Sequence, residues 1–200
     1  MNYTKKWNSI FVENIKKNKI KNQKLCLEIG CFEGLTSNYI AKNILSNDGL
    51  LICVDPLEDC YLVDNLSNDD HLNNKEKWSY FNGQYQRFLE NTRENTTKQK
   101  IKLIREKSSE ALPKLQENYQ NSFDFIYIDG DHREEPVYQD ALNSYKLCKV
   151  GGTILFDDYL WSSSDKSKPT KKGIDRFLKD FAGKLEVVDK NYQLMVKKII

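Results

Sequence analysis

Short apolar runs alternate with amphipathic stretches along most of the chain. Five of the apolar runs have the length and composition of buried strands: Leu25–Ile29, Leu50–Val54, Ile101–Ile104, Phe123–Ile128 and Thr153–Phe156. Apolar residues at helical spacing predict helices between them, at Leu35–Leu45, Gln84–Thr92, Ser109–Tyr119 and Pro136–Leu147. Strands that alternate with helices in this way are typical of βαβ units and a parallel sheet.

The pattern changes after the fifth strand. Gly173–Phe181 has the spacing of a helix, and two strand-like runs follow it, at Leu185–Val188 and Gln193–Lys197. The few residues between these runs cannot form a crossover helix, so the two strands must pair antiparallel. We therefore predict a three-layer α/β sandwich, in which a mostly parallel sheet of seven strands ends in a C-terminal antiparallel hairpin.

The length of 200 residues fits a single domain spanning residues 1–200. Within it, residues 1–22 are expected to form an N-terminal cap, with a helix at Asn2–Asn18 that covers the sheet or the site. Glu58–Lys77 has no clear periodicity and is rich in Asn, Asp and Ser. So long a loop is either a lid or binding loop, or an insertion tolerated at the surface.

The charges are nearly balanced, with 31 basic and 29 acidic residues and a net charge of +2. A nucleic-acid-binding surface would need a basic stripe, whereas the short basic runs of this chain are typical of solvated faces. No apolar stretch approaches the roughly 18–20 residues of a membrane span, and the chain begins without a signal-peptide core. The five cysteines show no Cys-x-x-Cys spacing and are expected to be reduced thiols. We therefore expect a cytoplasmic protein without nucleic-acid or membrane partners.

Acidic residues stand at the ends of the predicted strands. The first strand runs into the turn Glu28–Gly34, Asp55 follows the second strand, Asp129–His132 follows the fourth, and Asp157-Asp158 follows the fifth. In open α/β sheets the ligand lies beyond these carboxyl ends. The sequence therefore indicates a ligand site rich in carboxylates at this edge of the sheet.

The turn after the first strand does not match a dinucleotide site. Such a site needs glycines that let the backbone approach a pyrophosphate, but Phe32 stands where the middle glycine would be. S-adenosylmethionine (SAM) has no phosphate, and it carries a cationic sulfonium, an amino group and a ribose diol. Glu28 and Asp129 suit its cationic end, and Asp55 suits the ribose hydroxyls. We therefore predict SAM as the cofactor.

Four segments resemble one enzyme family. They are Leu27–Ser37, Glu106–Leu115, Asp124–His132 and Lys149–Tyr159. The first looks like motif I of the class I SAM-dependent methyltransferases, in the form found in methyltransferase domain family 24 and in the related catechol and caffeoyl-CoA O-methyltransferases. The four segments follow the family's order. The resemblance implies a Rossmann-like fold and methyl transfer from SAM, and it is compatible with a homodimer.

The resemblance also assigns roles to individual residues. Thr36 matches the hydroxyl residue that holds the SAM carboxylate, and Ser108 matches the residue that meets the adenine edge. The predicted cofactor-binding set is Glu28, Gly30, Cys31, Phe32, Gly34, Thr36, Asp55, Ser108 and Asp129. Asp129, Asp157 and Asp158 match the three ligands of a divalent cation in the metal-dependent branch.

The residue types support this metal site. Three carboxylates at two neighbouring strand ends would raise one another's pKa unless a cation joined them. Oxygen ligands suit Mg²⁺ first, with Mn²⁺ or Ca²⁺ as alternatives. The competing interpretation has one aspartate capping a helix and another facing water, with no ion between them.

His132 occupies the position at which the catechol-type enzymes carry a lysine. An imidazole with an ordinary pKa of about 6.5 can take a proton from an acceptor hydroxyl near neutral pH. We predict His132, Asp131 and Asp129 as catalytic residues, with a surface histidine in a polar loop as the alternative for His132. Five aromatic residues either line an acceptor pocket or belong to the core: Trp78, Tyr80, Phe81, Tyr159 and Trp161.

These observations predict a metal-assisted transfer of a methyl group from SAM to a hydroxyl of a small molecule, of the sugar or phenol class. Methyl transfer needs alignment and exclusion of water more than a nucleophilic triad. The alternative is a module that binds SAM or a nucleotide without catalysis and has a regulatory role. The segments expected to form the acceptor pocket, at 1–22, 58–77 and 162–171, carry no motif that identifies the acceptor.

Overall fold

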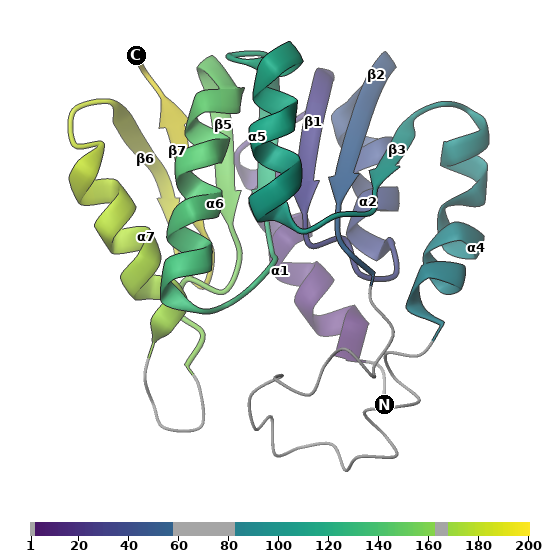
Figure 1. The fold of residues 1–200 in the computed structure, drawn as a ribbon, viewed down its shortest axis with the longest axis horizontal. Coiled ribbons are helices and arrows are strands. Elements are labelled where there is room, and N and C mark those ends of the chain that lie inside the picture. The colour runs from purple at the N-terminus through teal and green to yellow at the C-terminus, as the bar shows by residue number, and fades with distance from the viewer. Residues whose placement is uncertain (1–2, 58–82, 163–167) are drawn as a thin grey trace.

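The computed structural model describes residues 3–57, 83–162 and 168–200. Its centre is a seven-stranded sheet with the strand order β3-β2-β1-β4-β5-β7-β6 (Figure 1). Strands β1 to β5 run parallel, while β7 pairs antiparallel with both β5 and β6. The strands are β1 Gln23–Ile29, β2 Leu45–Val54, β3 Ile101–Ile104, β4 Phe123–Ile128, β5 Cys148–Phe156, β6 Leu185–Lys190 and β7 Leu194–Lys198. The predicted Rossmann-like fold with a C-terminal antiparallel hairpin is confirmed.

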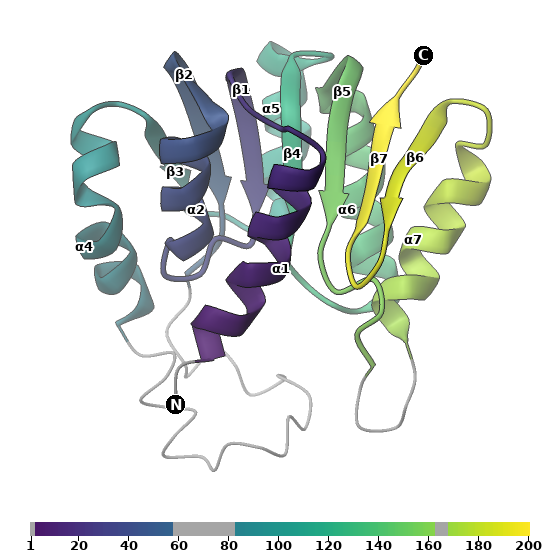
Figure 2. The same cartoon turned by 180° about the vertical axis from the view of Figure 1, so that it is seen from behind.

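Helices cover both faces of the sheet and complete the three layers (Figures 1 and 2). Helices α5, α6 and α7 share one apolar core with the sheet, and α1, α4 and the segment after α2 share the other. The helices are α1 Tyr3–Lys17, α2 Leu35–Tyr39, α4 Gln84–Thr97, α5 Ser108–Tyr119, α6 Glu134–Leu147 and α7 Pro169–Asp180, and Ile40–Ile44 forms a π-helix directly after α2. Consecutive strand residues point to opposite faces, so Leu27 lies in the first core and Cys26 in the second.

Three strands begin earlier than the apolar pattern predicts: β1 at Gln23, β2 at Leu45 and β5 at Cys148. Strand β2 pairs with β1 through Leu45 and again from Leu50 onward, so the polar residues between them loop out of the ladder. Strand β5 does the same between Cys148 and Thr153. The looped-out segments contain the turns that the sequence predicts, Ser-Asn-Asp-Gly in β2 and Gly151-Gly152 in β5, and strand pairing continues on either side of each turn.

Helix α1 crosses the face of the sheet that α4 and the segment after α2 also cover (Figure 2). The Phe11 ring lies 4.7 Å from the Tyr127 ring of β4 and 5.8 Å from the Tyr39 ring of α2, measured between centroids. The expected N-terminal helix therefore packs on the sheet close to the ends of its central strands. The predicted lid or insertion at Glu58–Lys77 lies outside the described residues. No helix in the described ranges has the length and apolar character needed to cross a membrane.

Candidate active site

The turn after β1, which we call the cofactor loop (Gly30–Gly34), requires glycine at its first position. Gly30 has a φ of +81°, and a Cβ built there would lie 2.0 Å from the carbonyl oxygen of Asp129. The loop therefore approaches the end of β4 more closely than any side chain permits. Gly34 precedes α2 with a φ of +82°, and a Cβ there would lie 2.5 Å from Thr92 of α4. The two glycines thus set the loop between β4 and α4.

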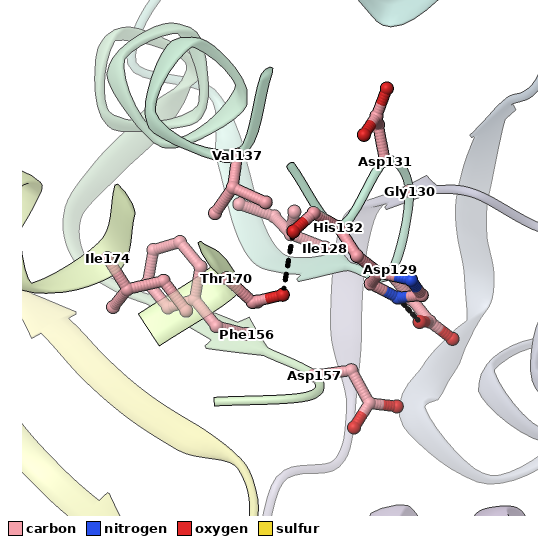
Figure 3. Close-up of a pocket in the computed structure, with 10 residues that line it drawn as sticks. All are labelled: Ile128, Asp129, Gly130, Asp131, His132, Val137, Phe156, Asp157, Thr170 and Ile174. Carbon is pink, nitrogen blue, oxygen red and sulfur yellow. Dashed lines mark hydrogen bonds and ion pairs between the residues drawn. The ribbon is translucent and has the colours of Figure 1, made fainter. Parts of the chain in front are cut away.

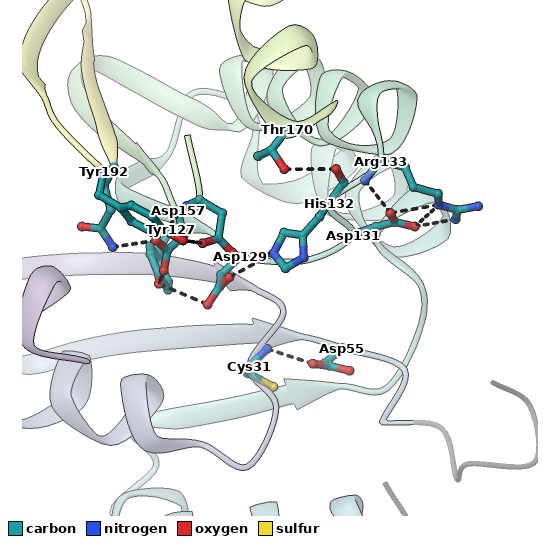
Figure 4. Close-up of polar contacts among 12 residues, drawn as sticks. Cys31, Asp55, Tyr127, Asp129, Asp131, His132, Arg133, Asp157, Thr170 and Tyr192 are labelled. Atoms are coloured by element: carbon teal, nitrogen blue, oxygen red, sulfur yellow. Dashed lines mark hydrogen bonds and ion pairs between the residues drawn. The ribbon is translucent and has the colours of Figure 1, made fainter. Parts of the chain in front are cut away.

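Asp55, at the end of β2, fixes the backbone of this loop (Figure 4). Its Oδ2 accepts hydrogen bonds from the backbone N–H groups of Cys31 and Phe32, each at 2.9 Å. Its Oδ1 accepts the N–H of Leu57, also at 2.9 Å. Carboxylate oxygens accept more than one hydrogen bond, so these contacts leave the predicted ribose role of Asp55 as a prediction.

Glu28 lies beneath the loop and is fully buried. Its Oε2 accepts the Ser37 hydroxyl at 2.5 Å and the Cys53 thiol at 3.4 Å, while its Oε1 has no hydrogen-bond partner among the described residues. Burial raises the pKa of Glu28 to about 8, against the opposing effect of the Ser37 and Cys53 hydrogen bonds. The carboxyl group is therefore protonated at neutral pH in this arrangement.

The predicted adenine residue Ser108 begins α5, and Thr36 lies in the first turn of α2; both are partly exposed. Sequence reasoning missed Asp140, a buried α6 residue that interacts with Ser108. Burial raises the pKa of Asp140 to about 6. A shallow depression beside the ends of β2 and β3 is lined by Pro56, Arg105, Glu106, Lys107 and Glu110.

A second group, which we call the acid cluster (Asp129, His132, Asp157 and Asp158), stands at the ends of β4 and β5. Figure 3 shows Asp129, His132 and Asp157 of this group. His132 Nε2 lies 2.7 Å from Asp158 Oδ2 and 3.7 Å from Asp129 Oδ1. One ligand atom from each of these three residues lies within 4.8 Å of the others, which is compatible with a shared metal ion. Asp158 has a φ of +52°, a left-handed conformation that is uncommon outside glycine.

Asp157 accepts hydrogen bonds on both of its oxygens, from donors other than His132. Its Oδ2 accepts the Tyr127 hydroxyl, and its Oδ1 accepts the Gln193 amide at 3.0 Å and the Asp158 N–H at 2.8 Å. The Tyr127 hydroxyl also lies 3.2 Å from Asp129 Oδ2. The structure therefore groups Asp129, Asp158 and His132, and it places the third predicted ligand, Asp157, beside them in a network of its own.

Sequence reasoning missed the donors around these acids. Tyr192 donates to Asp158 Oδ1 at 2.7 Å, in addition to the contacts that Tyr127 and Gln193 make with Asp157. Tyr192 and Gln193 lie in and beside the turn between β6 and β7, far along the chain from the acids. Asp157 can be predicted from its position at the end of a strand, but nothing in the local sequence identifies the residues that contact it.

The charges of the acid cluster are only partly balanced. Partial burial and the charge of Asp157 raise the pKa of Asp129 to about 7, and burial together with Asp158 raises that of Asp157. Partial burial lowers the pKa of His132, but its contacts with Asp129 and Asp158 outweigh this and raise it to about 10. The cluster therefore holds three carboxyl groups and one imidazolium, which contacts two of them, and this arrangement favours further positive charge.

Asp131, predicted as catalytic, points away from the acid cluster (Figure 3). Its carboxylate accepts hydrogen bonds from the Arg133 guanidinium, with Nε at 2.9 Å from Oδ2, and from the Arg133 backbone N–H at 2.9 Å (Figure 4). The structure thus separates Asp131 from His132, and its catalytic role stays a prediction.

Of the predicted aromatic residues, Trp161 lies beside the acid cluster. Its ring centroid is 5.4 Å from that of His132, and its side chain is partly exposed. Tyr159 is buried in the core, where its hydroxyl donates to Asp175 at 2.8 Å. Trp78, Tyr80 and Phe81 lie outside the described residues. Among the predicted aromatic residues that the structure describes, Trp161 is therefore the candidate for lining the acceptor site.

A family model described as a methyltransferase domain matches residues 27–159. This match spans both the cofactor loop and the acid cluster. The chain belongs to methyltransferase domain family 24. The match ends before α7, β6 and β7, so in this methyltransferase domain Tyr192 and Gln193 come from outside the matched region.

Relatives of this methyltransferase domain include plant enzymes and a viral protein. Caffeoyl-CoA O-methyltransferase 1 of Zea mays is 38% identical over 79 residues, which cover 36% of this chain and 30% of the maize protein. An uncharacterized protein of Acanthamoeba polyphaga mimivirus is 29% identical over 148 residues, covering 74% of this chain and 57% of the viral protein. The chain thus spans between about a third and somewhat over half of the length of these relatives.

Solved structures of O-methyltransferases share the fold. One from Bacillus cereus, in complex with SAH, superposes with a TM-score of 0.62 at 17% identity, covering 92% of this chain and 78% of that chain. TomG from Streptomyces achromogenes, in complex with SAM, gives a TM-score of 0.62 at 15% identity, covering 90% and 74% of the two chains. At these identities the likeness concerns the fold alone.

Proposed function

We propose that this protein is a SAM-dependent O-methyltransferase that uses a divalent cation to methylate a hydroxyl group of a small molecule. The observation that carries the proposal is the direct contact between the cofactor loop and the acid cluster. Gly30 lies against the backbone of Asp129, so a methyl donor held by the loop and an acceptor held by the cluster would meet at one strand end. Methyl transfer depends mainly on this alignment.

The cofactor loop suits SAM better than a dinucleotide. Its close approach to β4 leaves no glycine-rich cradle for a pyrophosphate, because Phe32 occupies the middle of the turn. We assign Gly30, Cys31, Phe32, Gly34 and Thr36 to the methionine side of SAM. For the ribose and adenine we assign Asp55 and Ser108, with Glu28 behind the loop. When bound, SAM supplies a methyl group on a cationic sulfur.

The acid cluster suits a hard divalent cation. Asp129 and Asp158 belong both to the set that the family resemblance implies and to the set that the geometry groups, and they are the core of the proposed site. Asp157 completes it as the resemblance implies, with His132 beside it. Carboxylate oxygens favour Mg²⁺ or Mn²⁺, and a bound cation lowers the pKa of an acceptor hydroxyl.

His132 is the proposed base, acting through Nε2. In the arrangement described, its contacts with Asp129 and Asp158 keep the imidazole protonated at neutral pH. His132 therefore takes up the proton of the acceptor only when these two carboxylates have another positive partner. We therefore propose that the base depends on the cation site. A cation bound to the two carboxylates would let His132 become neutral and able to accept a proton.

Trp161 supports the phenol class of acceptor over the sugar class. Its indole ring lies beside His132 and is partly exposed, so a planar ring can stack on it while its hydroxyl reaches the acid cluster. The proposed acceptor is therefore a small phenol.

Calorimetric titration of SAM and S-adenosylhomocysteine (SAH) into the protein, with Mn²⁺ and again with EDTA, tests the proposal. We expect SAM and SAH to bind, and Mn²⁺ to give a heat signal that is lost in Asp158→Ala. Methylation of a catechol or another phenol in the presence of Mn²⁺ would complete the case. Absence of SAM binding under both conditions would overturn it. Binding of SAM without turnover of any phenol or sugar would favour the non-catalytic alternative.

A further inference from the structure

Asp157 is oriented by two side-chain donors, one of which lies outside the family match, and both donors contact the N-terminal helix α1. One donor, Gln193, follows the β6–β7 turn and is 1% exposed. The other, Tyr127, lies in β4 and is 2% exposed. Both donors are therefore shielded from water, and their positions depend on what packs against them.

Gln193 has its amide orientation fixed from the side opposite to Asp157. The Asn14 amide Nδ2 of α1 donates to Gln193 Oε1 at 2.6 Å, while Gln193 Nε2 donates to Asp157 Oδ1 at 3.0 Å. Because the oxygen of a side-chain amide accepts and its nitrogen donates, the Asn14 contact holds the Gln193 nitrogen toward the carboxylate. A flipped amide would lose both hydrogen bonds.

Asn14 is itself held by the hairpin turn. Asn191 Nδ2 donates to Asn14 Oδ1 at 2.8 Å, and Asn191 Oδ1 accepts the backbone N–H of Gln193 at 2.8 Å. Asn14 is 5% exposed, which is unusual for an asparagine unless its polar atoms are satisfied. The three amides therefore form a closed network between α1 and the turn.

The same helix also contacts the second donor. Phe11 lies one turn before Asn14 on α1, and its ring packs on the Tyr127 ring at a centroid distance of 4.7 Å. The Tyr127 hydroxyl at the far end of that ring donates to Asp157 and lies close to Asp129. Helix α1 thus backs both side chains that hold the Asp157 carboxylate.

We propose that Asn14 and Gln193 form a positioning relay that sets the orientation of Asp157 for a divalent cation, and that docking of α1 thereby controls the affinity of the site for the cation. The proposal rests on the cation site of the proposed function. Residues that hydrogen-bond to metal-ligating carboxylates orient them, and their loss typically weakens metal affinity by roughly 10–100-fold. Asn14 and Gln193 act through Asp157 and are therefore positioning residues.

The test measures Mn²⁺ affinity by electron paramagnetic resonance of free Mn²⁺, in the full chain without turnover. Gln193→Met keeps the length of the side chain and removes its donor, and Asn14→Ala removes the contact that orients the amide. We expect about tenfold weaker Mn²⁺ binding in Gln193→Met and a smaller loss in Asn14→Ala. The double variant is expected to resemble Gln193→Met, because both changes break one chain of contacts.

Asn18→Ala is the matched control. Asn18 also joins α1 to the hairpin, through a 3.1 Å hydrogen bond to Asp189. It meets the relay at the backbone carbonyl oxygen of Asn14, at 3.0 Å, and the Asn14 side-chain amide that orients Gln193 is untouched by this contact. We expect its Mn²⁺ affinity to equal that of the wild type. SAM affinity measured in EDTA, unchanged within about twofold in each variant, would show that the fold is intact.

Three results would overturn the proposal. Wild-type Mn²⁺ affinity in Gln193→Met would remove the relay and leave the cation site in place. An equal loss in Asn18→Ala would mean that general docking of α1 is responsible. A wild-type protein that binds SAM but no Mn²⁺ would remove the cation site of the proposed function, and the relay with it.

Discussion

The cofactor loop and the acid cluster touch each other but are built in different ways. The loop is shaped by its own backbone, with glycines at positive φ and an aspartate that accepts two of its N–H groups. The acid cluster is shaped by side chains, which come from β4, β5, the β6–β7 hairpin and, through Asn14, from α1. A site formed by local backbone leaves a motif in the sequence, whereas a site formed by distant side chains does not.

Gly30→Ala is expected to have the largest effect, because both the positive φ and the contact with Asp129 exclude a Cβ. We expect a loss of at least about 2 kcal/mol in the free energy of unfolding, together with loss of SAM binding. Gly151→Ala is the control, since Gly151 has a φ of +82° and no atom within 4 Å of the added Cβ. Chemical denaturation would measure both, and equal losses would contradict the role given to the close approach.

Glu28→Gln should change how stability depends on pH. The unfolded chain releases the Glu28 proton near its ordinary pKa, whereas the folded chain keeps it until about pH 8. Folding therefore becomes less favourable as the pH rises through this window, by up to about 1.4 kcal/mol per pH unit. We expect Glu28→Gln to remove about 2 kcal/mol of the stability loss between pH 5.5 and 7.5. Urea denaturation at a series of pH values would measure the free energy of unfolding of both proteins. The same dependence on pH in the two proteins would contradict the prediction.

Asp158→Asn should weaken Mn²⁺ binding by at least about tenfold, because it removes a ligand atom from the acid cluster. Asp131→Asn, on the same edge of the sheet, should leave Mn²⁺ binding unchanged, since Asp131 pairs with Arg133. Calorimetry compares the two variants. Loss of turnover in Asp131→Asn with intact Mn²⁺ binding would support the predicted catalytic role of Asp131. An equal loss of Mn²⁺ affinity in both variants would contradict the separation of Asp131 from the acid cluster.

Arg133→Ala should have the smallest effect. The Arg133 side chain is 78% exposed, and exposed ion pairs contribute little to stability in water. We expect a change within about 0.5 kcal/mol in the free energy of unfolding. A thermal-denaturation series in increasing salt would check it, and a loss well above this value would mean that the pair with Asp131 supports the acid cluster.

The amino-acid sequence alone predicts the order of the elements, the antiparallel hairpin and the strand ends at which the acids stand. These features follow from local signals: the period of apolar residues, the length of a link and the glycines of a turn. The bounds of β3 and β4 were predicted to the residue, because their apolar runs end abruptly. The predicted bounds of β2 and β5 are too short, because turn segments loop out within these strands while pairing continues on both sides.

How the acids are held, and which of them lie together, depends on tertiary packing. The sequence marks Asp129, Asp131, Asp157 and Asp158 alike, yet folding turns Asp131 toward Arg133 and surrounds Asp157 with Tyr127 and Gln193. The burial of Glu28 beside Ser37 and Cys53, which raises its pKa, is likewise a result of packing. Hydrogen bonds and desolvation depend on distances between residues that are far apart in the chain, and the spacing of residues in the sequence carries no information about those distances.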